Sequence, residues 1–383
     1  MKKKSIVAPV LILLLPFFDP SFLTQDGMPE WIDYVIKGFQ IFAIFISAFF
    51  VPSVLNHPKA RVSHGILTLF LFVYLVIITI INNGSIFYSL SCLFQLFAVF
   101  TISSYFVFCK DGLEQLLSVL SIYLTILVLL DIVSLLFSTQ EWWVFGGKNN
   151  HIHFTLLYLF VSIAKCGIKK TVQLKDIFVP IILSTTIIFL ENSSTSIIAL
   201  GLNLFFIIFY ALRPEKSLSK ARNSILIIYG ISLVVSIILI MFEQYRYLEL
   251  VIAYYDKEDT FGRIGIWEQA VEYIRINPIW GYGLEELEVI GEKFQFEFTQ
   301  CHNKFVDVLY LGGVVGLSFF LFVLYYTFRK TKKNKTQLIL SFVLSVYAIV
   351  FITEGKRMNI PFYFMLFMYP IVSNYIEEKR LSV

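Results

Sequence analysis

Charged residues are scarce in this sequence. Of its 383 residues, only 15% are Asp, Glu, Lys or Arg, against about a quarter in a typical soluble domain. The apolar set makes up 57% of the chain and the mean hydropathy is +0.76. These values exclude an ordinary soluble globular domain and predict a protein whose main solvent is lipid.

Cysteine is also rare, and its spacing carries no motif. Cys92, Cys109, Cys166 and Cys301 include no CxxC pair and have no nearby His at zinc-finger spacing. His151 and His153 are two residues apart, which puts them on different sides of a helix and argues against joint metal binding. The sequence therefore predicts no metal site and no cofactor.

Patterns for nucleotide and serine chemistry are missing as well. The chain has no Walker motif and no GxSxG elbow, and Gly281-x-Gly283 lacks the third glycine of a dinucleotide fingerprint. We interpret that pair as a flexible turn, and Gly312, Gly313 and Gly316 as close helix contacts. The net charge is only +4 and the basic residues lie in short runs, which predicts no nucleic-acid partner.

Long apolar segments recur along the whole chain. A helix needs about 20 mainly apolar residues to cross a bilayer. The predicted fold is an all-α polytopic membrane protein, a single integral domain over residues 1–383 with about twelve transmembrane helices. The expected spans are residues 6–23, 34–52, 64–82, 86–108, 113–137, 152–168, 176–191, 195–212, 224–242, 303–328, 337–353 and 358–376.

The basic residues give these spans an orientation. With the N-terminus inside, most Lys and Arg of the short loops fall on the inner side, and the outer short loops hold only Lys37, Lys148, Lys356 and Arg357. Because orientation follows this bias, we expect both ends in the cytoplasm of a bacterium.

One connection is far longer than the others. Residues 243–302 precede the tenth span on the expected outer face, and loops of this length are usually functional or disordered. Apolar residues at helical spacing predict a helix from Arg263 to Ile276, which Asn277-Pro278 ends. A second helical stretch runs from Leu284 to Phe294. We call residues 243–302 the lid.

Ionisable groups near the end of the lid are candidates for chemistry. His302 stands at the span boundary, where an imidazole could accept a proton from a sugar hydroxyl, although a boundary His is also common as a plain interfacial residue. Asp307 lies about one turn into the span, where a carboxylate is costly, and it could equally be a buried partner of Lys304. The outward cations of the lid, Arg263 and Arg275 among them, suit an anionic ligand.

Three further polar clusters stand at the outer ends of predicted helices and could line one cavity. They are GGKNNHIH at 146–153, ENSSTS at 191–196 and TEGKRMN at 353–359.

The segments GRIGIWEQAVEYIRINPIWGYG (262–283) and HNKFVDVLYLGGVVGL (302–317) resemble the O-antigen ligase and Wzy-type polysaccharide polymerase family. Its pattern is an Arg, an aromatic residue and a helix, then Pro-x-x-Gly-x-Gly, then His-Asn leading into a Gly-rich span. The matching residues here are Arg263, Trp267, Pro278, Gly281, Gly283, His302 and Asn303.

This resemblance implies a metal-independent membrane glycosyltransferase that uses undecaprenyl-diphosphate-linked oligosaccharides as donor and acceptor. Arg263 would bind the diphosphate and His302 would be the catalytic base, with Trp267, Asn303 and Asp307 as further substrate-binding candidates. The family often has a Ser-Arg pair at the start of a middle span, where this chain has Asn192-Ser193 and no Arg. A second cation is then expected from Arg275, Lys148 or Arg357, in that order.

Three functions remain open on the sequence. The first is polymerisation of lipid-linked repeat units into a capsule, exopolysaccharide or O-antigen on the outer face of the cytoplasmic membrane, with other polysaccharide-assembly proteins as further candidate partners. The second is a ligase that transfers the finished glycan to another acceptor. The third is a flippase for the lipid-linked unit, but matching halves with polar sites at mid-membrane, as in many transporters, are not visible.

Overall fold

The computed structural model describes most of the chain in enough detail to follow its helices. It covers residues 9–381 except 10–11, 19–22, 24–27, 57–62, 109–110, 140–142, 170–171, 213–221, 245–260, 295–300, 330–334, 355 and 357.

The described secondary structure is entirely helical. Eleven of the expected spans, from the second to the twelfth, coincide with helical segments. These are α2 (Glu30–Leu55), α3 (Ser63–Ile81), α4 (Ile86–Phe108), α5 (Gly112–Phe137), α6 (His151–Gly167), α7 (Phe178–Glu191), α8 (Ser194–Leu212), α9 (Arg222–Ser236) with the π-helix η7 (Ile237–Met241), α13 (Lys304–Phe328), α14 (Lys335–Ser345) with α15 (Tyr347–Thr353), and α16 (Ile360–Leu381).

Seven described segments are both long and apolar enough to cross a membrane, and three shorter apolar helices accompany them. The seven are Glu30–Leu55, His64–Ile81, Ile86–Val107, Gly112–Phe137, Ser194–Leu212, Lys304–Phe328 and Lys335–Thr353. The chain is thus a multi-pass helical membrane protein, while twelve crossings and the outward side of the lid stay predictions.

The first expected span, residues 6–23, is interrupted in its described part. Leu15–Phe18 forms a 3-10 helix, η1, around Pro16, which has no amide hydrogen to continue an α-helix. Gln40 of α2 donates to the Pro16 carbonyl at 2.8 Å, and Phe18 packs edge-on against Phe364 of α16 at 5.1 Å. This short element is therefore packed into the bundle.

The centre of the bundle is formed by helices that are buried on all sides. Every residue of α14 after Lys335 is buried, as are nearly all of α6, and α16 contributes a long run of buried residues from Ile360 to Tyr369. By contrast, α2 has only 17% of its apolar window buried. Their burial on all sides places α6, α14 and α16 in the core, whereas the exposed apolar surface of α2 is available to lipid.

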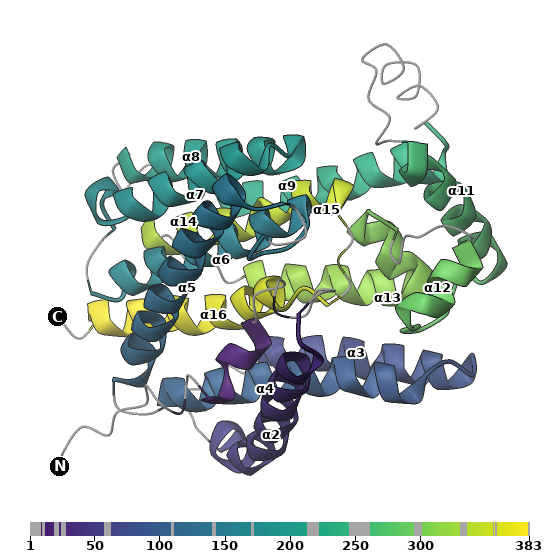
Figure 1. Cartoon of the computed structure of the whole chain (residues 1–383), viewed down its shortest axis with the longest axis horizontal. Coiled ribbons are helices and arrows are strands. Elements are labelled where there is room, and N and C mark those ends of the chain that lie inside the picture. The colour runs from purple at the N-terminus through teal and green to yellow at the C-terminus, as the bar shows by residue number, and fades with distance from the viewer. Residues whose placement is uncertain are drawn as a thin grey trace.

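The lid lies at one end of this bundle. In Figure 1 the axes of most long helices are roughly aligned. The lid helices α11 (Phe261–Ile276) and α12 (Leu287–Phe294) lie at the right, and the C-terminal end of α16 lies at the left. The two lid helices predicted from the sequence are confirmed. They frame the N-terminal half of α13, which begins at Lys304, two residues after His302.

Candidate functional site

His302 lies at the turn that enters α13. Its backbone has a positive φ of 45°, and the side chain is mostly buried, 12% exposed. Nδ1 lies 3.8 Å from Oε2 of Glu354, which follows α15 and is 5% exposed. The structure thus brings the end of the lid and the segment after α15 together at one imidazole and one carboxylate.

Asn303 holds this turn in place. Its Oδ1 accepts the backbone amides of Phe305 and Val306, both at 3.1 Å, which caps the N-terminus of α13. Its Nδ2 donates to Ser236 Oγ at 2.9 Å and to the Ile352 carbonyl at 3.0 Å. One side chain therefore joins α13, α9 and α15, and the predicted contact of Asn303 with substrate would require one of these bonds to open.

Trp267 connects the first lid helix to the same turn. Its indole N–H donates to the carbonyl of Cys301 at 2.8 Å, and the ring is buried. Arg263 stands four residues earlier in α11, and residues four apart share a helix face. The backbone of Arg263 is thus one turn from a residue that contacts the His302 turn, while its side chain lies outside the described atoms.

Of the other three predicted cations, only Arg275 has a side chain within the described part of the structure. Arg275 is 61% exposed and its guanidinium lies 3.4 Å from Glu243, which follows η7. It stands two turns beyond Trp267, about 12 Å along the helix. The side chain of Lys148 and the whole of Arg357 lie outside the described part of the chain.

Two lysines that were not proposed as site residues lie near His302. Lys304 is buried, with Nζ 3.7 Å from Asp307 Oδ2 and donating to the Lys356 carbonyl at 3.2 Å. Lys356 in turn donates to Asn150 Oδ1 at 3.3 Å. The pairing of Asp307 with Lys304, one of the two interpretations of that carboxylate, is confirmed.

The three outer polar clusters meet in the structure. Asn149 accepts a hydrogen bond from Ser193 at 3.1 Å, which joins the first cluster to the second. The first and third are joined by Lys356 with Asn150, and by Asn359 Nδ2 with His153 Nδ1 at 2.9 Å. These contacts gather the N-terminus of α6, the α7–α8 turn and the segment after α15 at one end of the core.

A second buried group of ionisable residues was not anticipated. His151 Nε2 lies 3.3 Å from Asp131 Oδ2 of α5, with both side chains fully buried. Glu191, at the end of α7, accepts from Ser196 at 3.1 Å and is close enough to His151, Asp131 and Glu354 to interact electrostatically. An acid inside an expected span, Asp131, was the available signal.

His151 and His153 turn to different partners, as their spacing predicts. Asp131 of α5 contacts the first, and Asn359 before α16 contacts the second. Among the described residues, no group of three or more His, Cys, Asp or Glu side chains is placed to hold a metal ion.

Helix α13 is broken close to its middle, at Gly313, where φ is 60° and ψ is −165°. In a regular helix the carbonyls of Tyr310 and Leu311 would accept the amides four residues later. Here they accept the lid amides of Tyr282, at 3.1 Å, and Gly283, at 2.7 Å. The lid thus occupies acceptors that the break leaves open.

The helix amides freed by the break also find partners in the lid. Val314 donates to the Pro278 carbonyl at 2.8 Å, and Val315 donates to the Ile279 carbonyl at 3.3 Å. The turn therefore replaces the missing helical bonds in both directions. We call this arrangement, residues 277–284 docked on the break in α13, the clasp.

Glycine makes the clasp possible because the two backbones approach so closely. A Cβ on Gly281 would lie 2.6 Å from the amide nitrogens of Gly312 and Gly313, and one on Gly313 would lie 2.1 Å from the Ile279 carbonyl oxygen. Gly281, Gly283 and Gly313 all have positive φ, which favours glycine. The turn predicted at Gly281-x-Gly283 is confirmed, but it is pinned by hydrogen bonds and is not free.

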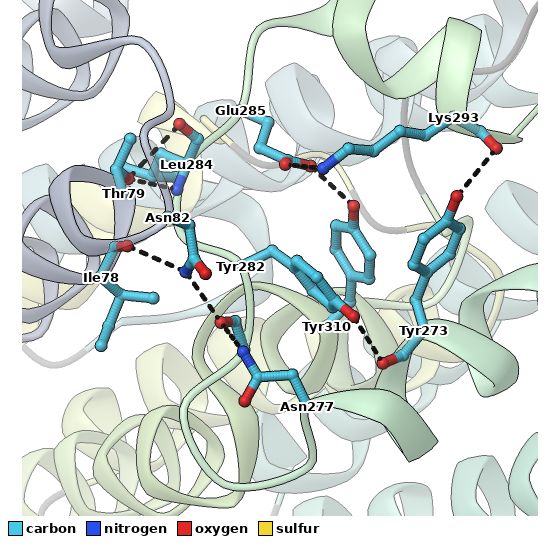
Figure 2. Close-up of polar contacts among 11 residues, drawn as sticks. Ile78, Thr79, Asn82, Tyr273, Asn277, Tyr282, Leu284, Glu285, Lys293 and Tyr310 are labelled. Atoms are coloured by element: carbon cyan, nitrogen blue, oxygen red, sulfur yellow. Dashed lines mark hydrogen bonds and ion pairs between the residues drawn. The ribbon is translucent and has the colours of Figure 1, made fainter.

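The end of α3 holds the clasp from its other side (Figure 2). Thr79 Oγ1 accepts the Leu284 amide at 2.7 Å, and Asn82 Nδ2 donates to the Gly281 carbonyl at 3.1 Å. Tyr74 OH donates to the carbonyl of Gly312 at 2.7 Å. The predicted close contacts of the α13 glycines are thus made with α3 as well as with the lid.

Three tyrosines and an ion pair complete the lid's packing on α13 (Figure 2). Tyr282 stacks on Tyr310 with ring centroids 5.1 Å apart, and Tyr273 packs edge-on against Tyr282 at 5.7 Å. Tyr310 donates to Glu285 at 2.6 Å, and Glu285 pairs with Lys293. Burial, with Tyr273 and Glu285 nearby, raises the pKa of Tyr282, so its hydroxyl stays protonated and donates to the Tyr273 carbonyl at 3.0 Å.

The clasp and the His302 turn lie within one stretch that matches a known family. Residues 179–321 match the family model described as O-antigen ligase. This stretch, somewhat more than a third of the chain, is similar to the O-antigen ligase family. Members of that family are membrane enzymes that act on lipid-linked glycans. The resemblance stated from the sequence is confirmed, whereas a comparison with curated proteins gives no match.

The O-antigen ligase segment contains part of the site. It runs from α7 into α13 and includes Glu191, Arg263, Trp267 and His302. Glu354, which follows α15, lies beyond its end and reaches His302 only through the fold.

Proposed function

We propose that the protein polymerises undecaprenyl-diphosphate-linked oligosaccharide repeat units into a cell-surface polysaccharide on the outer face of the bacterial cytoplasmic membrane. The observation that carries this proposal is the paired His302 and Glu354 at the entrance of α13, 3.8 Å apart, inside and beside an O-antigen ligase family segment. A partly buried imidazole next to a buried carboxylate is suited to take up a proton.

In the proposed reaction, a hydroxyl oxygen of one unit attacks the anomeric carbon of the glycan on the other lipid. The bond from that carbon to the diphosphate oxygen breaks, and the hydroxyl proton passes to His302. Glu354, whose Oε2 lies 3.8 Å from Nδ1, would stabilise the positive charge that the imidazole gains. The departing lipid diphosphate carries the negative charge.

Side-chain cations are the proposed partners of that leaving group. Arg263 has this role by resemblance to the family, because a guanidinium offers forked donors to phosphate oxygens. Lys356 supports the proposal as a second cation, since it lies two residues after Glu354 and bonds to Asn150. Preorganised positive charge that strengthens its contacts as the bond breaks lowers the barrier.

Extension of a chain and transfer of a finished glycan use the same chemistry with different acceptors. The family description names a ligase, whereas the richness in Phe, Ile, Lys and Asn is typical of low-GC bacteria and favours a capsule or exopolysaccharide polymerase. We therefore propose the polymerase, with the ligase as the alternative outcome.

The test is a reconstitution of the purified protein in vesicles with one defined lipid-linked repeat unit. Polymerisation predicts a ladder of lengthened glycans, each still on lipid diphosphate. Transfer only when a second, different acceptor is added would replace the polymerase by the ligase. Movement of the donor across the bilayer without any new glycosidic bond would support a flippase and contradict both.

A further inference from the structure

The lid carries an exposed apolar surface at its turn. Ile276 is 76% exposed, and Ile279 and Trp280 are each 54% exposed. The stretch from Ile276 to Leu284 has no charged residue, although Arg275 and Glu285 stand directly on either side. Large apolar side chains that gather on a soluble surface mark contact with another apolar phase.

The turn of the lid is bonded directly to two helices that are predicted to cross the membrane, α3 and α13. It is bonded to Tyr74, Thr79 and Asn82, which lie in or directly after the last two turns of α3. It is also bonded to the segment of α13 around Gly313. Both helices are long and apolar enough to cross a membrane, so the turn cannot stand far from the bilayer that they span.

The neighbouring surfaces of these helices are apolar and exposed too. Val314, whose amide bonds to the turn, is 54% exposed, and Ile81, next to Asn82, is 67% exposed. Phe87, at the start of α4 just beyond Asn82, is 90% exposed. The exposed apolar side chains of the turn therefore have exposed apolar residues of α3, α13 and α4 next to their backbone contacts.

The backbone carbonyls of the turn are bonded in the way that irregular structure in lipid requires. Non-helical backbone is tolerated at membrane depth only where its polar groups are satisfied within the protein. The carbonyls of Pro278, Ile279, Trp280 and Gly281 all accept bonds from α13, α3 or the turn itself. A turn exposed to water would not need partners for each of these groups.

We propose that residues 276–280 of the lid are immersed in the outer leaflet of the bilayer, where Ile276, Ile279 and Trp280 contact lipid acyl chains. The lid is then a re-entrant element of the membrane domain, and only its flanks with Arg275 and Glu285 face the headgroups and water. Trp is well suited to the boundary between the two phases.

This immersion limits how far the candidate site stands from the lipid, a consequence that rests on the proposed function. Asn303 and Gly313 are ten residues apart in one helical segment, so they lie within about 15 Å of each other. His302 is then within reach of the headgroup region, which is where the diphosphate of a lipid-linked donor lies.

The test uses the intrinsic fluorescence of the full-length protein in vesicles of phosphatidylcholine and phosphatidylglycerol. The contribution of Trp280 is obtained as the difference between the protein and its Trp280→Phe variant. We expect lipids brominated midway along an acyl chain to quench most of this contribution and aqueous iodide to quench little of it.

A matched control places a tryptophan on the other face of the lid. Glu292 of α12 is charged and exposed, so Glu292→Trp in the Trp280→Phe protein is expected to respond to iodide and not to brominated lipid. If the Trp280 contribution behaves like this control, or is shielded from both quenchers, the turn does not contact lipid. Neither readout involves glycan transfer, so failure here is distinguishable from failure of the proposed function.

Discussion

Val314 donates its backbone amide to Pro278, a residue of the lid, and not to Tyr310 one turn earlier in its own helix. Together with the matching bond from Tyr282 to Tyr310, this exchange makes the break in α13 a joint between the lid and a membrane helix. The residues of this joint and those of the His302 turn give separate predictions.

Replacing Gly313 by Ala is expected to destabilise the protein by about 1–3 kcal/mol or more, because a side chain at positive φ is strained and its Cβ would meet the Ile279 carbonyl. The thermal midpoint in detergent measures this. Gly201 of α8 has open space around it, so Gly201→Ala should leave the midpoint unchanged or slightly higher. Equal midpoints for the two variants would contradict the clasp.

Replacing Thr79 by Val should loosen the turn. The Leu284 amide loses its acceptor in a buried setting, and an unsatisfied buried amide costs about 1–3 kcal/mol. Hydrogen exchange of the peptide around residues 277–286 should become faster. Thr79→Ser keeps the hydroxyl and should exchange at the original rate, so acceleration in both variants would point to lost packing and not to the lost bond.

Replacing His302 by Ala should lower turnover by about a hundred- to ten-thousand-fold while donor binding is retained, as expected for a proton acceptor. Polymer formation and donor binding are measured on the reconstituted protein. His64 is a buried histidine of α3 bonded to the Phe367 carbonyl, and His64→Gln is the control that should keep turnover. Near-normal turnover in well-folded His302→Ala protein would remove His302 from the mechanism.

The role of Glu354 is best read from a double-mutant cycle. If the carboxylate acts through His302, Glu354→Gln should lower turnover in the original protein but add little in the His302→Ala protein, because coupled residues are not additive. Equal losses in both backgrounds would mean that Glu354 acts independently, for example by contacting substrate directly.

Replacing Arg263 by Ala should weaken donor binding and turnover together, and Arg263→Lys should restore little because an ammonium lacks the forked donors. Arg275, on the same helix, is exposed and paired with Glu243. Arg275→Ala tests the expectation from the sequence that Arg275 is the second cation. Because its side chain is exposed and paired, we expect a smaller loss than for Arg263→Ala. If Arg275→Ala is the more damaging variant, the two assignments must be exchanged.

Sequence patterns predicted the helices well because their signals are local. The apolar runs of α2 to α5, and the periodicity from Arg263 to Ile276 ended by Pro278, each lie within one segment. The break at Gly313 was not predicted. The break is accompanied by hydrogen bonds to lid residues about 30 positions earlier in the chain. In the sequence, a pair of glycines in an apolar run looks the same whether the glycines pack against another helix or break their own.

The site was predicted unevenly for a similar reason. His302 and Asn303 could be named from a motif, and the three polar clusters could be expected at one end because of the topology. The residues that contact these histidines could not be predicted. Glu354 lies far from His302 in the sequence, and Asp131 contacts His151 from another helix. Trp267 was expected at the substrate, whereas in the structure its indole bonds to the Cys301 carbonyl.

The contacts between α3 and the lid bear on how the protein is assembled in the cell. Thr79 and Leu284 are separated by 205 positions in the chain, so the surface that receives the lid is synthesised and inserted long before the lid emerges from the ribosome. Until then Thr79 and Asn82 lack the bonds to Leu284 and Gly281 that they make in the folded protein. Lid closure should consequently be one of the last steps of biogenesis, and a chain truncated before Leu284 should insert its early helices without forming the site.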